Sequence, residues 1–179
     1  MKDRVHIIRD AMATLAVALA IALATPSAAD PAAFVERFTG AWSGGGMVME
    51  DGMARPQRVS CRLEGREGPA SFTMAGRCRA MVVFSRAIAA NVSYDPATGQ
   101  FRGTYEGSRA GTAQLEGEQQ GDALQLSVVW PRPVHGDPRG RMTIVPQGDD
   151  GLRIVVEHPF APTADGQTIR SADLVLTRQ

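Results

Sequence analysis

Residues 123–130, ALQLSVVW, alternate between apolar and polar side chains over most of their length. In an extended strand, successive side chains point to opposite faces, so a segment of this kind has one apolar and one polar face. The pattern predicts a β-strand that buries one face in a core and leaves the other in water. The side chains on its apolar face are Leu124, Leu126, Val128 and Trp130.

Short segments of the same kind recur about every ten residues, separated by turn sequences such as DPATGQ and QGDDG, in which Gly and Asp favour tight turns. Only residues 30–38 have a helical character, with an Asp in the cap position followed by Pro in the first turn. The predicted strands cover residues 46–49, 58–64, 71–81, 87–94, 101–106, 111–117, 123–130, 141–146, 152–158 and 172–178.

Strands that each keep one apolar face can bury it by stacking two sheets or by closing into a barrel. The nearly uniform hairpin lengths favour closure, because Greek-key folds need long crossover connections. We therefore predict an all-β fold: a closed antiparallel meander β-barrel of about 8–10 strands with a short N-terminal helix. Residues 130–141, WPRPVHGDPRGR, are the least regular segment, and we expect a long connection there that forms a lid or a partner-facing lip.

The first 29 residues resemble a signal peptide. Basic side chains precede an apolar run that is short for a membrane span, Pro26 ends the run, and Ser27-Ala28-Ala29 supplies small side chains for cleavage. We predict that residues 1–29 are removed and that residues 30–179 form one domain of an exported bacterial-type protein. The expected location is the periplasm or the cell exterior, with no membrane span after cleavage.

Cys61 and Cys78 are the two cysteines of the chain. In an exported protein, two cysteines are more often bridged than free. A hairpin that turns around residues 66–69 sets them opposite each other, on the apolar faces of neighbouring strands. We predict a structural disulfide that fixes the register of this hairpin and contributes roughly 3 kcal/mol.

Several functional classes are not indicated by the sequence. There is no Gly-x-Ser-x-Gly elbow, no His-Glu-x-x-His motif, no phosphate-binding loop and no Cys/His cluster with metal-ligand spacing. Positive and negative side chains balance, at 19 each, so no basic surface for nucleic acid is expected. We predict a protein without enzymatic activity, bound metal or cofactor.

The N-terminal sequence FTGAW, residues 38–42, follows the predicted helix. This Phe-x-Gly-x-Trp pattern resembles the Gly-x-Trp entry of lipocalins and related calycin barrels. In those families, a basic side chain from the last strand packs on the indole at the closed end of the barrel. The resemblance implies that Arg178 stacks on Trp42 through a cation–π contact that joins the two ends of the domain.

The longer string Trp42-x-Gly44-x-Gly46 is also similar to the start of nitrobindin-like haem barrels. Those barrels bind iron through a histidine near the C-terminus, and His158 is the histidine of this chain with a matching position. A histidine on the rim or the surface is the simpler interpretation of His158, so haem binding stays a subordinate alternative.

The predicted function is the enclosure of an apolar or amphipathic small molecule, such as a lipid or a fatty acid, inside the barrel. The alternative is a packed barrel that binds another protein, as an inhibitor of a secreted enzyme or as a factor in envelope assembly. Parity along the strands selects these ligand-lining residues: Phe72, Met74, Tyr94, Phe101, Tyr105, Leu126, Val128, Ile144, Ile154 and Val156.

Overall fold

The computed structural model describes residues 30–81, 84–161, 163 and 166–179. The predicted signal peptide, residues 1–29, lies outside the described residues. Helix α1 (Pro31–Glu36) is followed by ten strands. These are β1 (Gly40–Val48), β2 (Gln57–Gly68), β3 (Ser71–Ala80), β4 (Phe84–Asp95), β5 (Gln100–Glu106), β6 (Ala113–Gln120), β7 (Ala123–Val134), β8 (Asp137–Gln147), β9 (Gly151–His158) and β10 (Ile169–Arg178).

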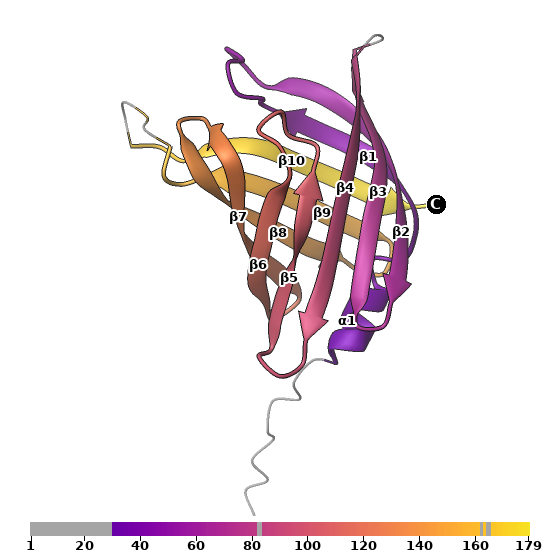
Figure 1. The fold of residues 1–179 in the computed structure, drawn as a ribbon. Coiled ribbons are helices and arrows are strands. Elements are labelled where there is room, and N and C mark those ends of the chain that lie inside the picture. Colours follow the sequence, from indigo (N-terminus) through magenta and orange to yellow (C-terminus); the bar gives the residue numbers. More distant parts are fainter. Residues whose placement is uncertain (1–29, 82–83, 162, 164–165) are drawn as a thin grey trace, which may run out of the picture.

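The strands form one closed antiparallel barrel in which each strand pairs with its neighbours in the sequence (Figure 1). The ring closes between β1 and β10, where Trp42 is the register partner of Arg178. The predicted closed meander is therefore confirmed. Because the connections alternate between the two ends, α1 and the β2–β3 turn lie at one end, and the β1–β2 and β7–β8 connections lie at the other.

Strand β1 is longer than predicted and begins at Gly40 rather than at residue 46. Its glycines lie against neighbouring backbone: a Cβ at Gly44 would stand 2.1 Å from the carbonyl oxygen of Val175. Glycine in a strand marks such close approach of another chain segment. The same residues that weaken the alternation pattern therefore allow β1 to pack closely between β2 and β10.

The prediction of a long irregular connection at residues 130–141 was wrong. Strand β7 continues to Val134 and β8 starts at Asp137, so the connection consists of His135 and Gly136, with φ angles of 53° and 90°. Two consecutive residues with positive φ form the tight turn that matches the twist of a hairpin. The prolines are accommodated by a register shift between Val129 and Val134, because proline cannot donate a hydrogen bond to the neighbouring strand.

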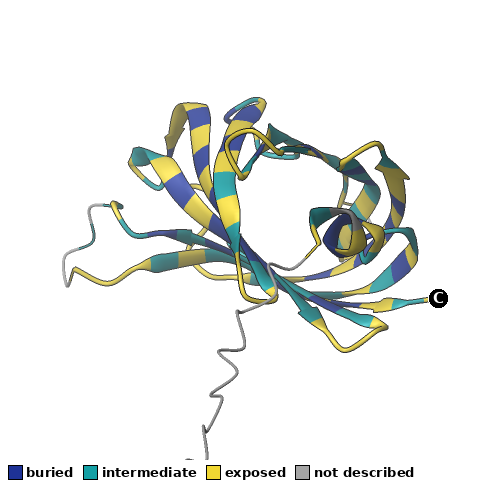
Figure 2. Cartoon of the chain, turned by 90° about the horizontal axis from the view of Figure 1, so that it is seen from below, coloured by how far each residue is buried: buried dark blue, intermediate teal, exposed yellow. Residues whose placement is uncertain are grey.

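The end that carries α1 is closed by aromatic packing. Figure 2 views this end and shows α1 lying across part of the strand ring. The Phe38 ring stacks on the Phe72 ring with centroids 4.2 Å apart, and Phe34 meets both Phe38 and Phe101 edge to face. All four rings are buried. We call this region, built on α1, Phe72, Phe101 and Trp42, the closed end.

Trp42 and Arg178 join the two ends of the domain at the closed end. The indole Nε1 donates a hydrogen bond to the Phe38 carbonyl at 3.1 Å, and the Arg178 guanidinium lies 4.5 Å from the indole centroid. The guanidinium also donates to the carbonyl oxygens of Thr39 and Arg37. One arginine therefore satisfies the backbone after α1 and stacks on the buried indole, as the family resemblance implies.

The disulfide between Cys61 and Cys78 links β2 and β3, and the two residues are direct register partners. Their Cα atoms are 4.0 Å apart. This confirms the predicted bridge and the predicted hairpin. Among the described residues, no helix has the length and apolar character needed to cross a lipid bilayer.

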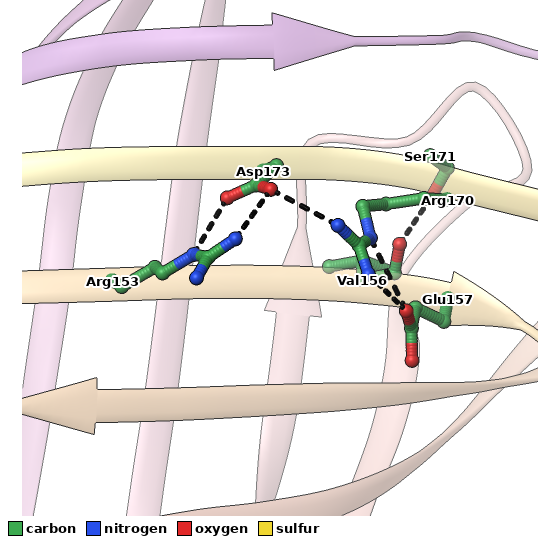
Figure 3. Close-up of polar contacts among 6 residues, drawn as sticks. All are labelled: Arg153, Val156, Glu157, Arg170, Ser171 and Asp173. Atoms are coloured by element: carbon green, nitrogen blue, oxygen red, sulfur yellow. Dashed lines mark hydrogen bonds and ion pairs between the residues drawn. The ribbon is translucent and has the colours of Figure 1, made fainter.

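The outer surface of β9 and β10 carries a network of ion pairs (Figure 3). Arg153 holds both carboxylate oxygens of Asp173, at 2.9 and 2.8 Å, and Arg170 bridges Asp173 to Glu157. The hydrogen bonds from Arg153 lower the pKa of Asp173 below its usual value. The outward faces of these strands are thus adapted to water.

Candidate ligand-binding site

A cavity of about 1020 Å³ opens at the end of the barrel opposite α1. Three of the five connections at that end, β1–β2, β3–β4 and β5–β6, contribute to its wall, together with strand segments next to the opening. The wall residues fall in the ranges 48–59, 78–81, 84–88, 105–110, 130–134, 156–158 and 171–174. We call this region the open end. This volume lies at the upper limit of the range for small-molecule sites in proteins, which is roughly 300–1,000 Å³.

The strand residues of the wall are mainly apolar. They come from β1, β2, β3, β4, β5, β7, β9 and β10 and are contiguous with the packed core. Such a surface favours the hydrocarbon part of a ligand, because burying it removes apolar area from water. The apolar wall residues shared with the core or packed against it are Val48, Val59, Cys78, Ala80, Ile88, Tyr105, Ala110, Trp130, Val134, Val156, Ala172 and Leu174.

The rim of the cavity is charged. Glu50 forms ion pairs with Arg86 at 3.0 Å and with Arg109 at 3.4 Å. Arg132 donates hydrogen bonds to the carbonyl oxygens of Ala110 and Arg109. Arg86 also donates to the Gly107 carbonyl. These contacts hold the β5–β6 connection against β4, β7 and the β1–β2 connection, and they place polar groups where a ligand meets water.

One side of the cavity wall is aromatic and polar. The rings of Trp130 and His158 stack with centroids 5.1 Å apart, and His135 meets His158 edge to face at 5.0 Å. His135 is held by a hydrogen bond from Nε2 to the Met49 carbonyl and by one from its backbone N–H to Asp51. The β7–β8 turn therefore places an imidazole over the end of β9.

His158 is fully buried, with no exposed surface. Its Nε2 lies 2.9 Å from the Ser171 hydroxyl, and that hydroxyl donates to the Val156 carbonyl at 3.4 Å (Figure 3). With the hydroxyl proton directed to Val156, Nε2 carries the imidazole proton and Nδ1 is left with a lone pair. Burial, reinforced by nearby His135, lowers the His158 pKa to about 4, so the ring is neutral at pH 7.

Two polar atoms of this wall have no hydrogen-bond partner among the described residues. They are Nδ1 of His158 and Nε1 of Trp130, and both are buried. Most buried polar atoms in native proteins are paired, and an unpaired one is costly. These two atoms belong to stacked rings in the wall of one cavity.

The structure places the ten predicted ligand-lining residues at different heights in the barrel. Tyr105 and Val156 lie in the cavity wall. The other eight lie in the packed region, because parity assigns a residue to the inner face without giving its height along the barrel axis. Six of these are buried in the core: Phe72, Met74, Phe101, Leu126, Val128 and Ile144. The other two, Tyr94 and Ile154, are partly buried against it.

Several residues of the site were not selected from the sequence. Alternation places Trp130 on an inner face but predicts no role for it, and Ser171 lies outside the predicted strands. The inward parity of both Trp130 and His158 was a usable signal, but their contact depends on the register of β7, β8 and β9. The rim residues Glu50 and Arg86 gave no signal, since their pairing joins segments 36 residues apart.

The surroundings of His158 do not fit haem ligation. One ring nitrogen is held by Ser171, the other is buried, and the ring is stacked on Trp130 with His135 at its edge. Iron would have to displace these contacts to reach either nitrogen. Among the residues that the structure describes, no group of three or more His, Cys, Asp or Glu side chains is arranged to hold a metal ion.

The fold and the site together define a closed ten-stranded antiparallel barrel with a cavity at one end. The architecture is compatible with a lipocalin-like barrel. No protein-family model matches the chain, and no curated protein matches it significantly.

Proposed function

We propose that this protein is a non-enzymatic binding protein of the periplasm or the cell exterior that encloses an apolar or amphipathic small molecule, such as a lipid. The observation that carries the proposal is the cavity of about 1020 Å³, whose inner wall is apolar and whose rim is charged. A ligand with a hydrocarbon part and a polar end matches this division. The disulfide is consistent with an oxidising compartment.

The Ser171–His158 pair supports binding rather than nucleophilic catalysis. A serine nucleophile needs a base whose pKa lies near the working pH and a third group that orients that base. The His158 pKa is lowered to about 4, and its Nδ1 has no partner among the described residues. An imidazole in this state is a weak base at neutral pH.

The test is native mass spectrometry of the full-length protein purified from the envelope or culture medium of its own source. We expect a bound species of a few hundred daltons that is lost when the protein is unfolded and extracted with organic solvent. Protein isolated only with a second polypeptide bound would instead favour the protein-interaction alternative. Protein isolated without any bound molecule, and with no affinity for lipids after extraction, would contradict the proposal.

A matched pair of variants locates the site. Ala172→Trp places a large side chain in the cavity wall on β10, whereas Val175→Trp places the same side chain on the exposed face of that strand. We expect Ala172→Trp to reduce lipid binding at least tenfold and Val175→Trp to leave it within about twofold of the unmodified protein. Equal binding by both variants would place the ligand elsewhere.

A further inference from the structure

We propose that the Trp130–His158 pair is a subsite for a neutral hydroxyl group, so that the cavity prefers an amphiphile with an alcohol end over an ionised fatty acid. This inference rests on the proposed function and narrows the class of ligand. The two rings come from β7 and β9, which lie on either side of β8, and both line the cavity. Each presents one buried polar atom without a partner among the described residues.

The two atoms are complementary in hydrogen bonding. The indole nitrogen of Trp130 can only donate a hydrogen bond. Nδ1 of His158 accepts one when the Ser171 hydroxyl donates to Val156, because Nε2 then carries the imidazole proton, and the subsite includes this assignment of the tautomer. A hydroxyl group both accepts and donates, so a single hydroxyl at the edge of the two stacked rings would pair with both atoms.

A carboxylate fits this pair less well. An ionised carboxylate can accept from Trp130 but has no proton to donate, and it brings a negative charge against the lone pair of His158. Protonation of His158 would remove this conflict, but the ring is fully buried, and the positive form of His135 beside it opposes a second charge. Asp51 and Asp137 act in the opposite direction and are the acidic groups that favour the charged ring.

The rim offers a carboxylate a different position. Arg86 and Arg109 pair with Glu50 in the cavity wall, and Arg132 donates to the backbone of Arg109 and Ala110 in the same wall. A negatively charged ligand end would be attracted to these arginines rather than to the Trp130–His158 pair. A comparison of alcohol, acid and alkane of one chain length therefore distinguishes the two positions.

The experiment measures displacement of the fluorescent probe 1-anilinonaphthalene-8-sulfonate from the intact, disulfide-bonded protein at pH 7.5 by dodecane, dodecan-1-ol and dodecanoate. We expect dodecan-1-ol to bind at least about tenfold more tightly than dodecane, and more tightly than dodecanoate, which is ionised at this pH. Equal affinities for alcohol and alkane, or tighter binding of dodecanoate, would overturn the subsite while leaving the binding function in place. Failure of all three to bind would overturn the proposed function as well.

Variants assign the preference to the two rings. His158→Phe keeps a buried aromatic ring without Nδ1, and we expect it to bring the affinity for dodecan-1-ol to within about twofold of that for dodecane. Trp130→Phe is expected to have the same effect. The control is Trp42→Phe, which changes an indole whose N–H already donates to Phe38 at the closed end. An alcohol preference that survives in both His158→Phe and Trp130→Phe, with the fold verified by circular dichroism, would contradict the subsite.

Discussion

The two tryptophans of the described chain lie at opposite ends of the barrel, and their surroundings differ. At the closed end, the Trp42 indole donates to Phe38 and is covered by the Arg178 guanidinium. At the open end, the Trp130 indole stacks on His158, and its N–H has no partner among the described residues. One end is packed and satisfied in its hydrogen bonds, whereas the other holds a cavity with unpaired polar atoms.

This difference indicates how stability and binding are divided along the barrel axis. Helix α1 fills the closed end with aromatic side chains, so the strands there are held by dense packing. The open end keeps space that the protein's own side chains do not fill, which lowers its contribution to stability and leaves room for a ligand. The strands pass through both regions, so each strand offers matched positions for comparison.

The largest expected difference is between two leucines on β10. Leu176 is fully buried near the closed end, and Leu174, two residues earlier, lies in the cavity wall. We expect Leu176→Ala to lower the free energy of unfolding by about 3–5 kcal/mol and Leu174→Ala by about 2 kcal/mol or less, because fewer packing contacts are lost beside an existing cavity. Urea denaturation of both variants measures this, and equal losses would contradict the division into a packed and a hollow end.

The disulfide lies between the two regions, since Cys61 is buried in the core and Cys78 lines the cavity. Replacing both cysteines with alanine is expected to lower the free energy of unfolding by about 3 kcal/mol, because the unfolded chain loses a constraint. The cavity should persist, since ten backbone register pairs also hold β2 to β3. Probe binding measured below the unfolding transition checks this, and loss of binding in a folded double variant would show that the bridge shapes the site.

The pH dependence of stability should report on the open end. An unfolded histidine takes up a proton near pH 6.5, but buried His158 does so only near pH 4, so the unfolded state binds more protons between these values. Stability is therefore unaffected above pH 6.5 and falls as the pH drops from about 6.5 to about 4, by at most about 3 kcal/mol. Thermal unfolding across this range measures the effect, and His158→Phe should flatten it. The same slope in wild type and variant would contradict a neutral, buried His158.

The smallest expected losses in the free energy of unfolding come from a comparison of two arginines, one at the closed end and one on the outer surface. Arg178→Met removes the stacking on Trp42 and the hydrogen bonds to the backbone after α1, and we expect a loss of about 1–2 kcal/mol. Arg153→Met breaks the exposed pair with Asp173 shown in Figure 3 and should cost less than about 1 kcal/mol. Denaturant titration of both variants makes the comparison, and a larger loss for Arg153→Met would show that the outer surface contributes more than the closed end does.

Much of the fold could be predicted from local patterns. Alternation along the chain identified all ten strands, and the spacing of the turns favoured a meander that closes on itself. The pairing of Cys61 with Cys78 followed from the position of one hairpin turn. The closing contact of Trp42 with Arg178 came from a family resemblance rather than from periodicity.

The candidate site was harder to predict, because it depends on distances along the barrel axis. Phe101 and Tyr105 lie on one strand and share an inner face, but Phe101 packs against Phe34 of α1, whereas Tyr105 borders the cavity. Alternation along the strands does not reveal which end of the barrel α1 fills, because that depends on tertiary packing. The predicted lid was wrong for a local reason, since His135 and Gly136 both adopt the positive φ of a two-residue hairpin turn, which is most typical of Asn-Gly and Asp-Gly sequences.

A crystal structure of the protein grown with 12-bromododecan-1-ol tests the central claim most directly, because the anomalous signal of bromine reports where the chain of the amphiphile lies. We expect a bromine peak inside the barrel at the open end, within the cavity bounded by Val156 and Leu174. A bromine peak among the aromatic rings of the closed end, or only on the outer surface of the barrel, would contradict the division of the molecule into a packed end and a ligand-holding end.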